Sequence, residues 1–367
     1  MRLEQTEPAA VGLDSERLEA ARALLKKGLD LGEYTCAVYL IGRKGKVAAC
    51  GSLGRLGDET SAEATLDSIF DMASVTKPVA TATSLMILLE RGTLHLNQPV
   101  TDFFPGERLP HLAGVTVKQL VTHTSGLPAW RDLFSEDGTR EGAIERLLHT
   151  PLENPPGTKH VYSCLGYITL GLIIEKVSGM SLADFARENI FVPLGMDDSQ
   201  FNPPAEKYAR IAWTANARGR ERPIVGEVHD ENCHAMGGNA GNAGLFSTAP
   251  DLALYAQCLL NGGKFESTRI LSPLSVIKML TNQINQSIGG QSYGFFTPPN
   301  DMLPGGDLFS HRCAGHTGFT GTSLLIDPEY EIFVILLTNR VYKKREAPDF
   351  LRRRRWFHNI VASAITG

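Results

Sequence analysis

Apolar residues at the two ends of the chain are spaced as in β-strands. Two β-rich runs lie at 35–41 and 46–50, and the glycine-bounded turn 42–45 between them predicts an antiparallel hairpin. Towards the other end, the apolar runs 321–326 and 331–337 flank Asp-Pro-Glu-Tyr, a sequence typical of a tight turn. We therefore expect four strands, two from each end of the chain.

Most of the remaining chain has the periodicity of α-helices. Residues 14–29 carry leucine and alanine on one face of an amphipathic helix, and residues 79–90 have the 3.6-residue period of a buried helix. Residues 196–246 are rich in Pro, Gly and Asn, which predicts loops. Further helices are expected at 115–122, 139–149, 167–177, 182–190, 250–261 and 348–365.

This order of elements predicts an α+β protein with two lobes. Strands at both ends, with helices inserted between them, place residues 1–80 and 250–367 in one lobe, an antiparallel sheet flanked by helices. Residues 81–249 would form a second, mainly helical lobe. Active sites tend to lie in clefts between such units, so we expect the functional site there.

The composition excludes some classes of function. The 367 residues are 43% hydrophobic and 21% charged, as in globular proteins with a large core. A net charge of −4 gives no reason to expect a nucleic-acid partner. No apolar run is long enough to span a bilayer, and the first residues lack a signal-peptide pattern. We expect a cytoplasmic protein without membrane or nucleic-acid partners; the oligomeric state stays open.

Cysteines and arginines add two further expectations. The six cysteines are scattered without paired spacing, which predicts reduced thiols and no disulfide framework.

Basic residues cluster at 343–345 and at 352–355, where four arginines follow one another. Consecutive residues spread around a helix at 100° per step, so these arginines cannot form one binding face. We expect a solvated terminal helix with some ion pairing, not a polyanion site.

The segment 68–78, Ser-Ile-Phe-Asp-Met-Ala-Ser-Val-Thr-Lys-Pro, carries the strongest chemical signature. Ser74 lies where an extended run turns into a helix, and Lys77 follows on the same helical face. A desolvated lysine can take the proton of a serine hydroxyl, and N–H groups at a helix start favour an oxyanion. Ser-x-x-Lys also occurs at Ser275, but that serine follows an N-cap serine and a proline, which indicates an ordinary helix start.

Other catalytic signatures are missing. The chain has no Gly-x-Ser-x-Gly elbow and no zinc spacing, and the possible ligands at 229–234 lack helical spacing. The glycine-rich run 237–244 follows no strand and carries no Lys-Ser or Lys-Thr, so we interpret it as close backbone packing beside a cleft and not as a phosphate cradle. We expect no metal and no cofactor.

Three ordered motifs carry a family resemblance. Ser74-Val-Thr-Lys77, Tyr162-Ser163-Cys164 and His316-Thr317-Gly318 resemble those of penicillin-recognising serine hydrolases. That family comprises class C β-lactamases, D,D-peptidases, D-aminopeptidases and family VIII carboxylesterases. The resemblance runs from about residue 10 to the C-terminus and implies the β-lactamase/D,D-peptidase-like two-lobe fold.

The resemblance also implies roles for individual residues. Ser74 would be the nucleophile, Lys77 a general base or proton relay, and Tyr162 a partner base whose pKa the lysine charge lowers. The backbone N–H groups of Ser74 and Phe319 would form the oxyanion hole. We expect His123 to brace its loop and not to react. The residues expected to contact substrate are Trp130, Cys164, His316, Thr317 and Gly318.

Two departures from the family bear on the substrate. Cys164 stands where the family usually has Asn, whose amide grips a substrate amide; a thiol is a weak donor and a poor acceptor. His316 stands where the family usually has Lys, which pairs with a substrate carboxylate, and a histidine is only partly charged at neutral pH. Since an ester needs less leaving-group protonation than an amide, these departures favour esters.

We therefore expect a serine hydrolase that forms an acyl-enzyme on Ser74, most simply a carboxylesterase for small esters. A β-lactamase or a D-amino-acid-specific peptidase (D,D-peptidase or D-aminopeptidase) is the alternative. A second alternative is a non-catalytic binding domain on the same scaffold, against which the retention of Ser74, Lys77 and Tyr162 argues. The expected partner is a small-molecule ester or amide.

Overall fold

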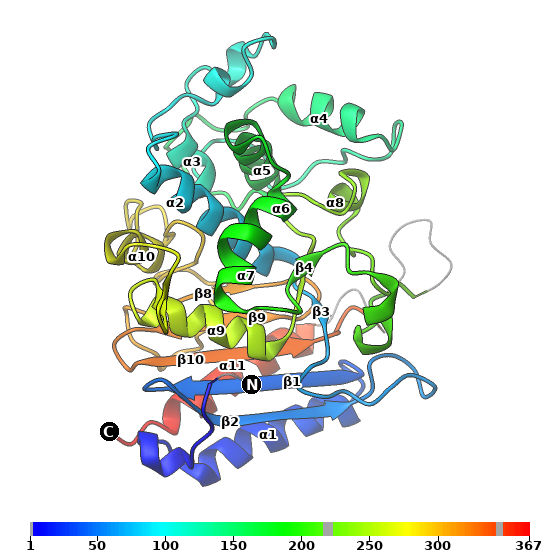
Figure 1. Ribbon diagram of the computed structural model, residues 1–367, viewed down its shortest axis with the longest axis vertical. Helices are drawn as coiled ribbons and strands as arrows, with labels where there is room; N and C mark the ends of the chain where they lie inside the picture. Colours follow the sequence, from blue (N-terminus) through cyan, green and yellow to red (C-terminus); the bar gives the residue numbers. More distant parts are fainter. Residues whose placement is uncertain (1–2, 216–222, 343–347) are drawn as a thin grey trace.

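The computed structural model describes residues 3–215, 223–342 and 348–367 (Figure 1). A five-stranded antiparallel sheet in the order β2-β1-β10-β9-β8 joins both ends of the chain, as the strand pattern predicts. The strand β8, which lies at one edge, was not expected from that pattern. The strands are β1 (Cys36–Arg43), β2 (Lys46–Gly54), β8 (Ala314–Thr317), β9 (Ser323–Asp327) and β10 (Ile332–Thr338).

The central strands β1 and β10 are buried along their whole length because helices cover both faces of the sheet. Helices α1 (Ser15–Asp30) and α11 (Pro348–Ser363) lie together on one face, and α9 (Ala249–Leu260) packs on the other (Figure 1). Side chains alternate between faces along a strand. Tyr39 and Ile41 accordingly join the core under α1 and α11, whereas Val38 and Leu40 join the core on the α9 side.

Helix α11 differs from the expected solvated helix. Arg353 is buried and forms an ion pair with Glu33, which ties α11 to the end of α1 (Nε–Oε2 2.7 Å). The expected ion pairing is found for the exposed Arg352, which contacts Asp349, and for Arg355, which contacts Asp307. The basic residues 343–345 lie outside the described residues.

The helices between the two groups of strands lie above the sheet in the view of Figure 1, around α5, whose residues 165–174 are all buried. Periodicity predicted most of these helices, but the lobe boundaries 1–80, 81–249 and 250–367 stay a prediction. The helices are α2 (Thr83–Glu90), α3 (Val117–Val121), α4 (Arg140–Leu148), α5 (Cys164–Ser178), α6 (Leu182–Ala186), α7 (Val192–Leu194) and α8 (Glu231–Ala235).

Smaller elements complete the fold. A three-stranded sheet, β3-β5-β4, brings the segment before Ser74 beside residues that follow the glycine-rich run. Its strands are β3 (Phe70–Asp71), β4 (Gln200–Phe201) and β5 (Leu245–Ser247). The hairpin β6 (Lys264–Phe265) and β7 (Thr268–Arg269) precedes α10 (Pro273–Leu280).

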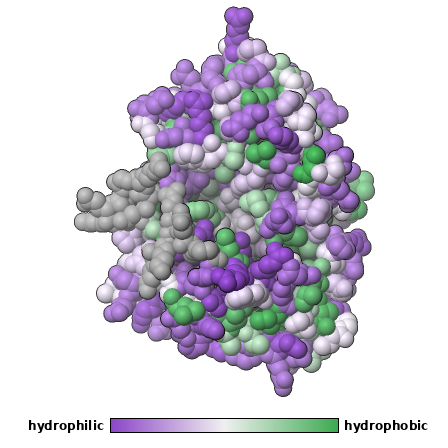
Figure 2. Space-filling model, turned by 180° about the vertical axis from the view of Figure 1, so that it is seen from behind, coloured by the Kyte–Doolittle hydropathy of each residue, from purple (hydrophilic) through white to green (hydrophobic). Residues whose placement is uncertain are grey.

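Two observations concern the surface and the helix lengths. On the face shown in Figure 2, hydrophilic residues predominate and hydrophobic residues occur in small groups. In the described part of the chain, no single helix is long and apolar enough to cross a membrane. Helix α5 and the segment Leu182–Leu194 reach that length and composition only together, with a 76° bend between them.

Candidate active site

Ser74 lies on a short turn between a strand and a helix, as the sequence predicts. Strand β3 ends at Asp71, the 3₁₀ turn Ala73–Val75 carries Ser74, and a π-helical turn, Lys77–Ala82, continues into α2. Ala73 has a φ of 45°, a left-handed conformation that is rare for a residue with a side chain. The backbone is therefore bent sharply just before the serine.

The turn between β8 and β9 packs directly against the residues before Ser74. Thr322 Oγ1 donates a hydrogen bond to the carbonyl of Met72 (3.0 Å). A Cβ on Gly318 would lie 2.5 Å from that same carbonyl oxygen and 2.1 Å from Thr322 Oγ1, so only glycine fits there. Phe319 follows in this turn, and the contacts fix its backbone relative to Ser74.

Lys77 is fully buried beside the serine. Its Nζ lies 2.9 Å from Ser74 Oγ, 2.9 Å from the carbonyl oxygen of Asn242 and 3.5 Å from Cys164 Sγ. The same nitrogen lies 4.9 Å from the centre of the Tyr162 ring. The contacts orient the amine towards the serine hydroxyl, at a distance that lets a proton pass between the two atoms.

The glycine-rich run 237–244 supplies the backbone contact that orients Lys77. A Cβ on Gly241 would lie 1.9 Å from the carbonyl oxygen of Tyr167, and Thr81 Oγ1 donates to the carbonyl of Gly241 (2.7 Å). The interpretation as close backbone packing is confirmed. Its function in holding Lys77 was missed because the Asn242 contact is made by a carbonyl group, which side-chain identity does not reveal.

Tyr162 lines the site, but its pKa moves in the direction opposite to the expected one. Burial, and then the nearby Cys164, raise the pKa of Tyr162 well above 10, although a hydrogen bond with Ser74 acts in the other direction. The expectation of an easily formed phenolate was wrong because desolvation, which favours the neutral phenol, outweighs the hydrogen bond with Ser74. The Tyr162 ring also packs against the ring of His123, with 4.7 Å between the ring centres.

His123 has the contacts expected of a brace. Its Nδ1 accepts a hydrogen bond from the backbone N–H of Ser163 (3.0 Å), in the tyrosine motif. Burial, and then the charge of Lys77, lower the pKa of His123 well below 6.5, so the ring is neutral. A neutral ring with Nδ1 as acceptor positions the backbone beside Tyr162.

His316 does not line the pocket, in contrast to the expected contact with substrate. It is fully buried and stacks on Phe296 with 4.4 Å between ring centres, and its Nδ1 donates to the Thr317 carbonyl (2.9 Å). Burial, followed by the charge of Lys77, lowers the pKa of His316 to about 3. A neutral, buried imidazole brings no charge to a substrate carboxylate.

A pocket of about 930 Å³ opens beside Ser74. Its walls come from both of the predicted lobes, and Lys77 lies behind them. The expected site residues that line it are Ser74, Trp130, Tyr162, Cys164, Thr317, Gly318 and Phe319. Residues that the motifs did not predict are Phe134, His229, Met302, Leu303, Arg340, Leu351 and Arg354, among others. Ser275, by contrast, lies at the start of α10, where its hydroxyl donates a hydrogen bond to Glu90.

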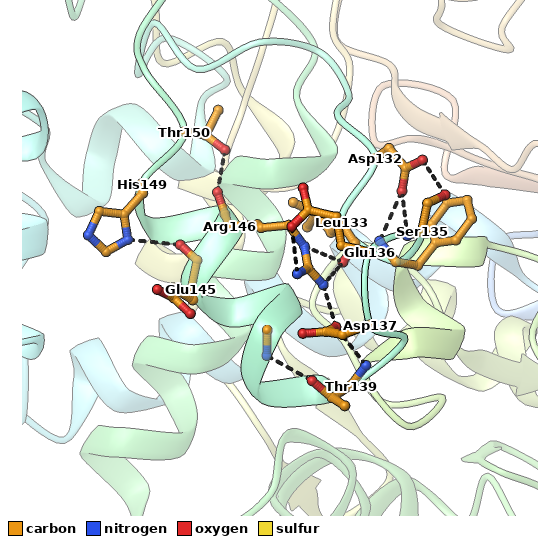
Figure 3. A network of polar contacts seen from close by, with 12 residues as sticks. Asp132, Leu133, Ser135, Glu136, Asp137, Thr139, Glu145, Arg146, His149 and Thr150 are labelled. Atoms are coloured by element: carbon orange, nitrogen blue, oxygen red, sulfur yellow. Dashed lines mark hydrogen bonds and ion pairs between the residues drawn. The ribbon is translucent and has the colours of Figure 1, made fainter.

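The loop that carries Trp130 is held by a polar network centred on Arg146 of α4 (Figure 3). The Arg146 guanidinium donates to the Leu133 carbonyl from Nε (3.0 Å) and from Nη2 (2.6 Å), and to Asp137 Oδ1 (2.8 Å). Trp130 is 46% exposed at the pocket, three residues before Leu133. The network therefore supports a pocket wall through its backbone.

Asp71 is another residue whose function the sequence analysis did not predict. Its buried carboxylate accepts hydrogen bonds from the backbone N–H groups of Ala73 (2.8 Å) and His229 (2.7 Å). Burial raises its pKa to about 6. One side chain thus joins the turn before Ser74 to the segment that carries His229 in the pocket wall. No local pattern indicates a contact between residues so far apart in the chain.

Known proteins resemble this chain over almost its whole length. The family model described as Beta-lactamase matches residues 21–355. A protein of Escherichia coli (strain K12) named "Putative D-alanyl-D-alanine carboxypeptidase" is 30% identical, covering 95% of this chain and 88% of its own. The solved structure of EstCE1, a hydrolase with promiscuous acyltransferase activity, has a TM-score of 0.76 at 21% identity and covers 94% and 99% of the two chains. An octameric penicillin-binding protein homologue from Pyrococcus abyssi has a TM-score of 0.73 at 26% identity, covering 92% and 76%.

Proposed function

This chain belongs to the beta-lactamase family and is a serine hydrolase of that superfamily; we propose that it is a carboxylesterase that cleaves small esters through an acyl-enzyme on Ser74. The contact between Lys77 Nζ and Ser74 Oγ, 2.9 Å long and made in a buried site, is the observation that carries this proposal. A buried amine at this distance can act as the base that a serine nucleophile requires.

Acylation begins when the amine of Lys77 takes the proton of Ser74. The serine oxygen bonds to the ester carbonyl carbon, and the carbonyl oxygen becomes an oxyanion held by the backbone N–H groups of Ser74 and Phe319. The bond to the leaving alkoxide then breaks, and the alkoxide takes the proton from Lys77. Water repeats the sequence on the acyl-enzyme, which releases the carboxylic acid and restores Ser74.

Tyr162 acts in this scheme as a neutral phenol. Because burial raises its pKa, Tyr162 keeps its own proton, and a neutral phenol is a poor acceptor for the proton of Ser74. Lys77 takes that role alone. A phenol hydroxyl beside the serine can instead donate a hydrogen bond to the leaving-group oxygen. This assignment replaces the partner-base role that the family resemblance implied.

Preference for esters rests on Cys164, which lies beside Lys77 and lines the pocket. A thiol at this position offers a substrate amide neither a strong donor nor a strong acceptor. The alternative, a peptidase for D-amino-acid peptides, is supported by the name of the Escherichia coli relative.

The decisive experiment compares three substrates with Ser74→Ala as the blank: p-nitrophenyl butyrate, a chromogenic cephalosporin and D-alanyl-D-alanine. We expect Ser74-dependent hydrolysis of the ester at least about 100-fold faster, as kcat/KM, than of the other two. Faster turnover of the cephalosporin or of the dipeptide would replace the esterase by that activity. Absence of any Ser74-dependent turnover would favour a non-catalytic binding domain.

A Cys164→Asn variant tests the reason for the preference. Restoring an amide at this position should lower the ratio of ester to cephalosporin turnover by about tenfold, because an amide can bind the substrate amide. Cys50→Asn, the same change at a half-buried position of β2 outside the pocket, is the matched control. An unchanged ratio in Cys164→Asn would show that another feature selects the substrate.

A further inference from the structure

The segment 229–234, His-Asp-Glu-Asn-Cys-His, carries polar side chains that have no place in the proposed reaction, although several of its residues line the pocket. Helix α8 begins directly after Asp230. The segment is hydrogen-bonded both to the loop that carries Trp130 and to the glycine-rich run 237–244. It therefore connects a wall of the pocket to the backbone that orients Lys77.

Asn232 fixes α8 against the loop of Trp130. Its buried side chain accepts a hydrogen bond from the backbone N–H of Leu133 through Oδ1 (3.0 Å) and donates one to the carbonyl of Arg131 through Nδ2 (2.8 Å). A buried amide whose oxygen and nitrogen are both bonded holds one orientation. The helix thus has a fixed place beside the pocket.

Asp230 caps α8 and also binds the glycine-rich run. Its Oδ1 accepts hydrogen bonds from the backbone N–H of Cys233 (2.8 Å) and from the side-chain Nδ2 of Asn242 (3.1 Å). Asn242 is fully buried, and only the NH₂ group of its amide can donate to a carboxylate. Asp230 therefore fixes the orientation of the Asn242 side chain.

The backbone of the same Asn242 contacts the catalytic amine. Its carbonyl oxygen lies 2.9 Å from Lys77 Nζ, which in turn lies 2.9 Å from Ser74 Oγ. Hydrogen bonds weaken steeply when donor and acceptor are misaligned, so a shift of this carbonyl turns the amine away from the hydroxyl. Displacement of a reacting group by about 1 Å can lower a rate by about 100-fold. The position of Asn242 therefore bears directly on the rate.

Asp230 can influence the site through its charge as well as through the position that it gives to Asn242. Its charge contributes, after burial and Cys164, to the raised pKa of Tyr162, so it lies within electrostatic range of the reacting groups. The two hydrogen bonds at Oδ1 use the carboxylate only as an acceptor, and an uncharged amide oxygen in the same place can accept both. Charge and position can therefore be separated by substitution.

We propose that Asp230 is a positioning residue of the hydrolysis, which acts on Lys77 through Asn242. The inference rests on the proposed function, since it adds a residue to the machinery of the same site. In this role Asp230 takes no proton and contacts no reacting atom. Its loss should lower kcat and leave KM nearly unchanged, whereas the loss of a substrate contact raises KM.

A double-mutant cycle tests the link. Asp230→Ala and Asn242→Ala should each lower kcat for p-nitrophenyl butyrate by about 10- to 100-fold, the factor for a lost hydrogen bond to a charged group, with KM within about twofold. Since both changes break the same link, the double variant should be no slower, within about twofold, than the slower single variant. Effects that multiply, or a kcat of Asp230→Ala within about twofold of the unaltered protein, overturn the proposal.

A conservative variant separates position from charge. Asp230→Asn keeps an oxygen that accepts both hydrogen bonds, so kcat should recover to within about threefold of the unaltered protein. A fall as deep as that of Asp230→Ala would assign the effect to charge and overturn the positioning role.

Asp14→Ala is the matched control for the loss of a helix cap. Asp14 caps α1 by accepting hydrogen bonds from the backbone N–H groups of Glu16 and Arg17, outside the pocket. This variant should leave kcat unchanged. A fall in kcat equal to that of Asp230→Ala would mean that losing a cap is enough, and the proposal would be overturned.

An exchange of the two side chains covers the case in which an alanine variant fails to fold. Asn242→Asp places two carboxylates within hydrogen-bond distance of each other and should lower kcat through their repulsion. Adding Asp230→Asn restores one donor and one acceptor with their roles exchanged, and should recover kcat by at least about tenfold. No recovery in the double variant overturns the proposal.

A fluorophosphonate reagent separates this inference from the proposed function, because it phosphonylates an activated serine whatever ester the protein prefers. Labelling of Ser74, followed by mass spectrometry, should slow in both alanine variants and recover in Asp230→Asn. Labelling of the unaltered protein without Ser74-dependent ester hydrolysis would overturn the esterase alone. Equal labelling rates in the unaltered protein and both alanine variants overturn the role of Asp230. Absence of both hydrolysis and labelling in the unaltered protein overturns both.

Discussion

The two sides of the pocket differ in how their charged groups are held. On the serine side, the amine of Lys77 is fully buried and contacts Ser74, Asn242 and Cys164. On the α11 side, several arginines surround the cavity, and Arg354 has a buried nitrogen that lacks an acceptor in the described part of the chain. A buried amine that contacts a hydroxyl is suited to move a proton, whereas a guanidinium keeps its proton and contributes only charge and hydrogen bonds.

The comparison separates catalysis from selection of substrate. On the serine side, Ser74 and Lys77 lie within a few residues of one strand-to-helix turn, so a short motif contains both reacting groups. The α11 side forms only when a helix from the end of the chain packs beside a turn of the central sheet. Variants on the two sides should therefore have distinct kinetic effects, which the following predictions use.

Lys77→Met should have the largest effect. The change keeps the length of the side chain but removes the amine that contacts Ser74 Oγ, so kcat should fall by about 10²- to 10⁴-fold, the usual contribution of a general base. The fall should be equal for an ester that carries a free carboxylate group and for its methyl ester, because the lysine acts on the serine and not on the charge of the substrate. Steady-state kinetics with both esters measures this directly. A fall confined to the carboxylate ester would mean that Lys77 acts on the charge of the substrate and not on the serine.

Asp71→Asn should have an intermediate effect on activity. An asparagine oxygen can replace one hydrogen bond, to Ala73 or to His229, but the amide NH₂ would face the other backbone N–H. The variant thus loses one hydrogen bond and leaves one buried N–H donor unpaired. Both the turn before Ser74 and the pocket wall that contains His229 are disturbed, and kcat/KM should fall by about tenfold. Ester hydrolysis at pH 7 measures the effect. A rate within twofold of the unaltered protein would show that the carboxylate does not position the serine.

The same variant should change how stability depends on pH. The pKa of Asp71 is about 6 in the folded protein and ordinarily 3.8, so the folded state binds the proton more tightly. Its stabilising contribution is therefore complete below pH 4 and is lost as the pH rises through 6, by about 3 kcal/mol in all. Asp71→Asn should lose more stability at pH 4 than at pH 7, as measured by denaturant unfolding.

Asp251 of α9 provides a matched control for Asp71. It also is buried with a pKa raised to about 6, and it accepts hydrogen bonds from Ser199 and from the backbone of Asp198, outside the pocket. Asp251→Asn should reproduce the change in pH dependence without the loss of activity. A loss of activity in both variants would point to a general effect of removing a buried carboxylate.

The sequence predicted those parts of the fold and site that depend on local pattern. The contact between Ser74 and Lys77 follows from helical spacing, and the shared sheet follows from strands at both chain ends. By contrast, the pKa of Tyr162 and the burial of His316 depend on packing. Burial raises the pKa of Tyr162, although the nearby lysine predicts a lowered one, and packing buries His316, although its motif predicts contact with substrate. The approach of Arg354 to the pocket depends on how α11 docks on the sheet, which no short motif encodes.

The smallest predicted effect concerns Arg146, which acts on the pocket only through the backbone of Leu133. Arg146→Met removes two hydrogen bonds to that carbonyl and one to Asp137, and so loosens the loop that carries Trp130. Because the serine side keeps its contacts, KM should rise by about two- to fivefold with kcat nearly unchanged, the pattern of weakened ground-state binding. Arg140→Met removes an arginine of the same helix that contacts Glu175 and the Met236 carbonyl and not this loop, and it should leave KM as it is. A fall in kcat with KM unchanged would mean that the loop positions the reacting groups, in which case the two sides of the pocket would not be separable.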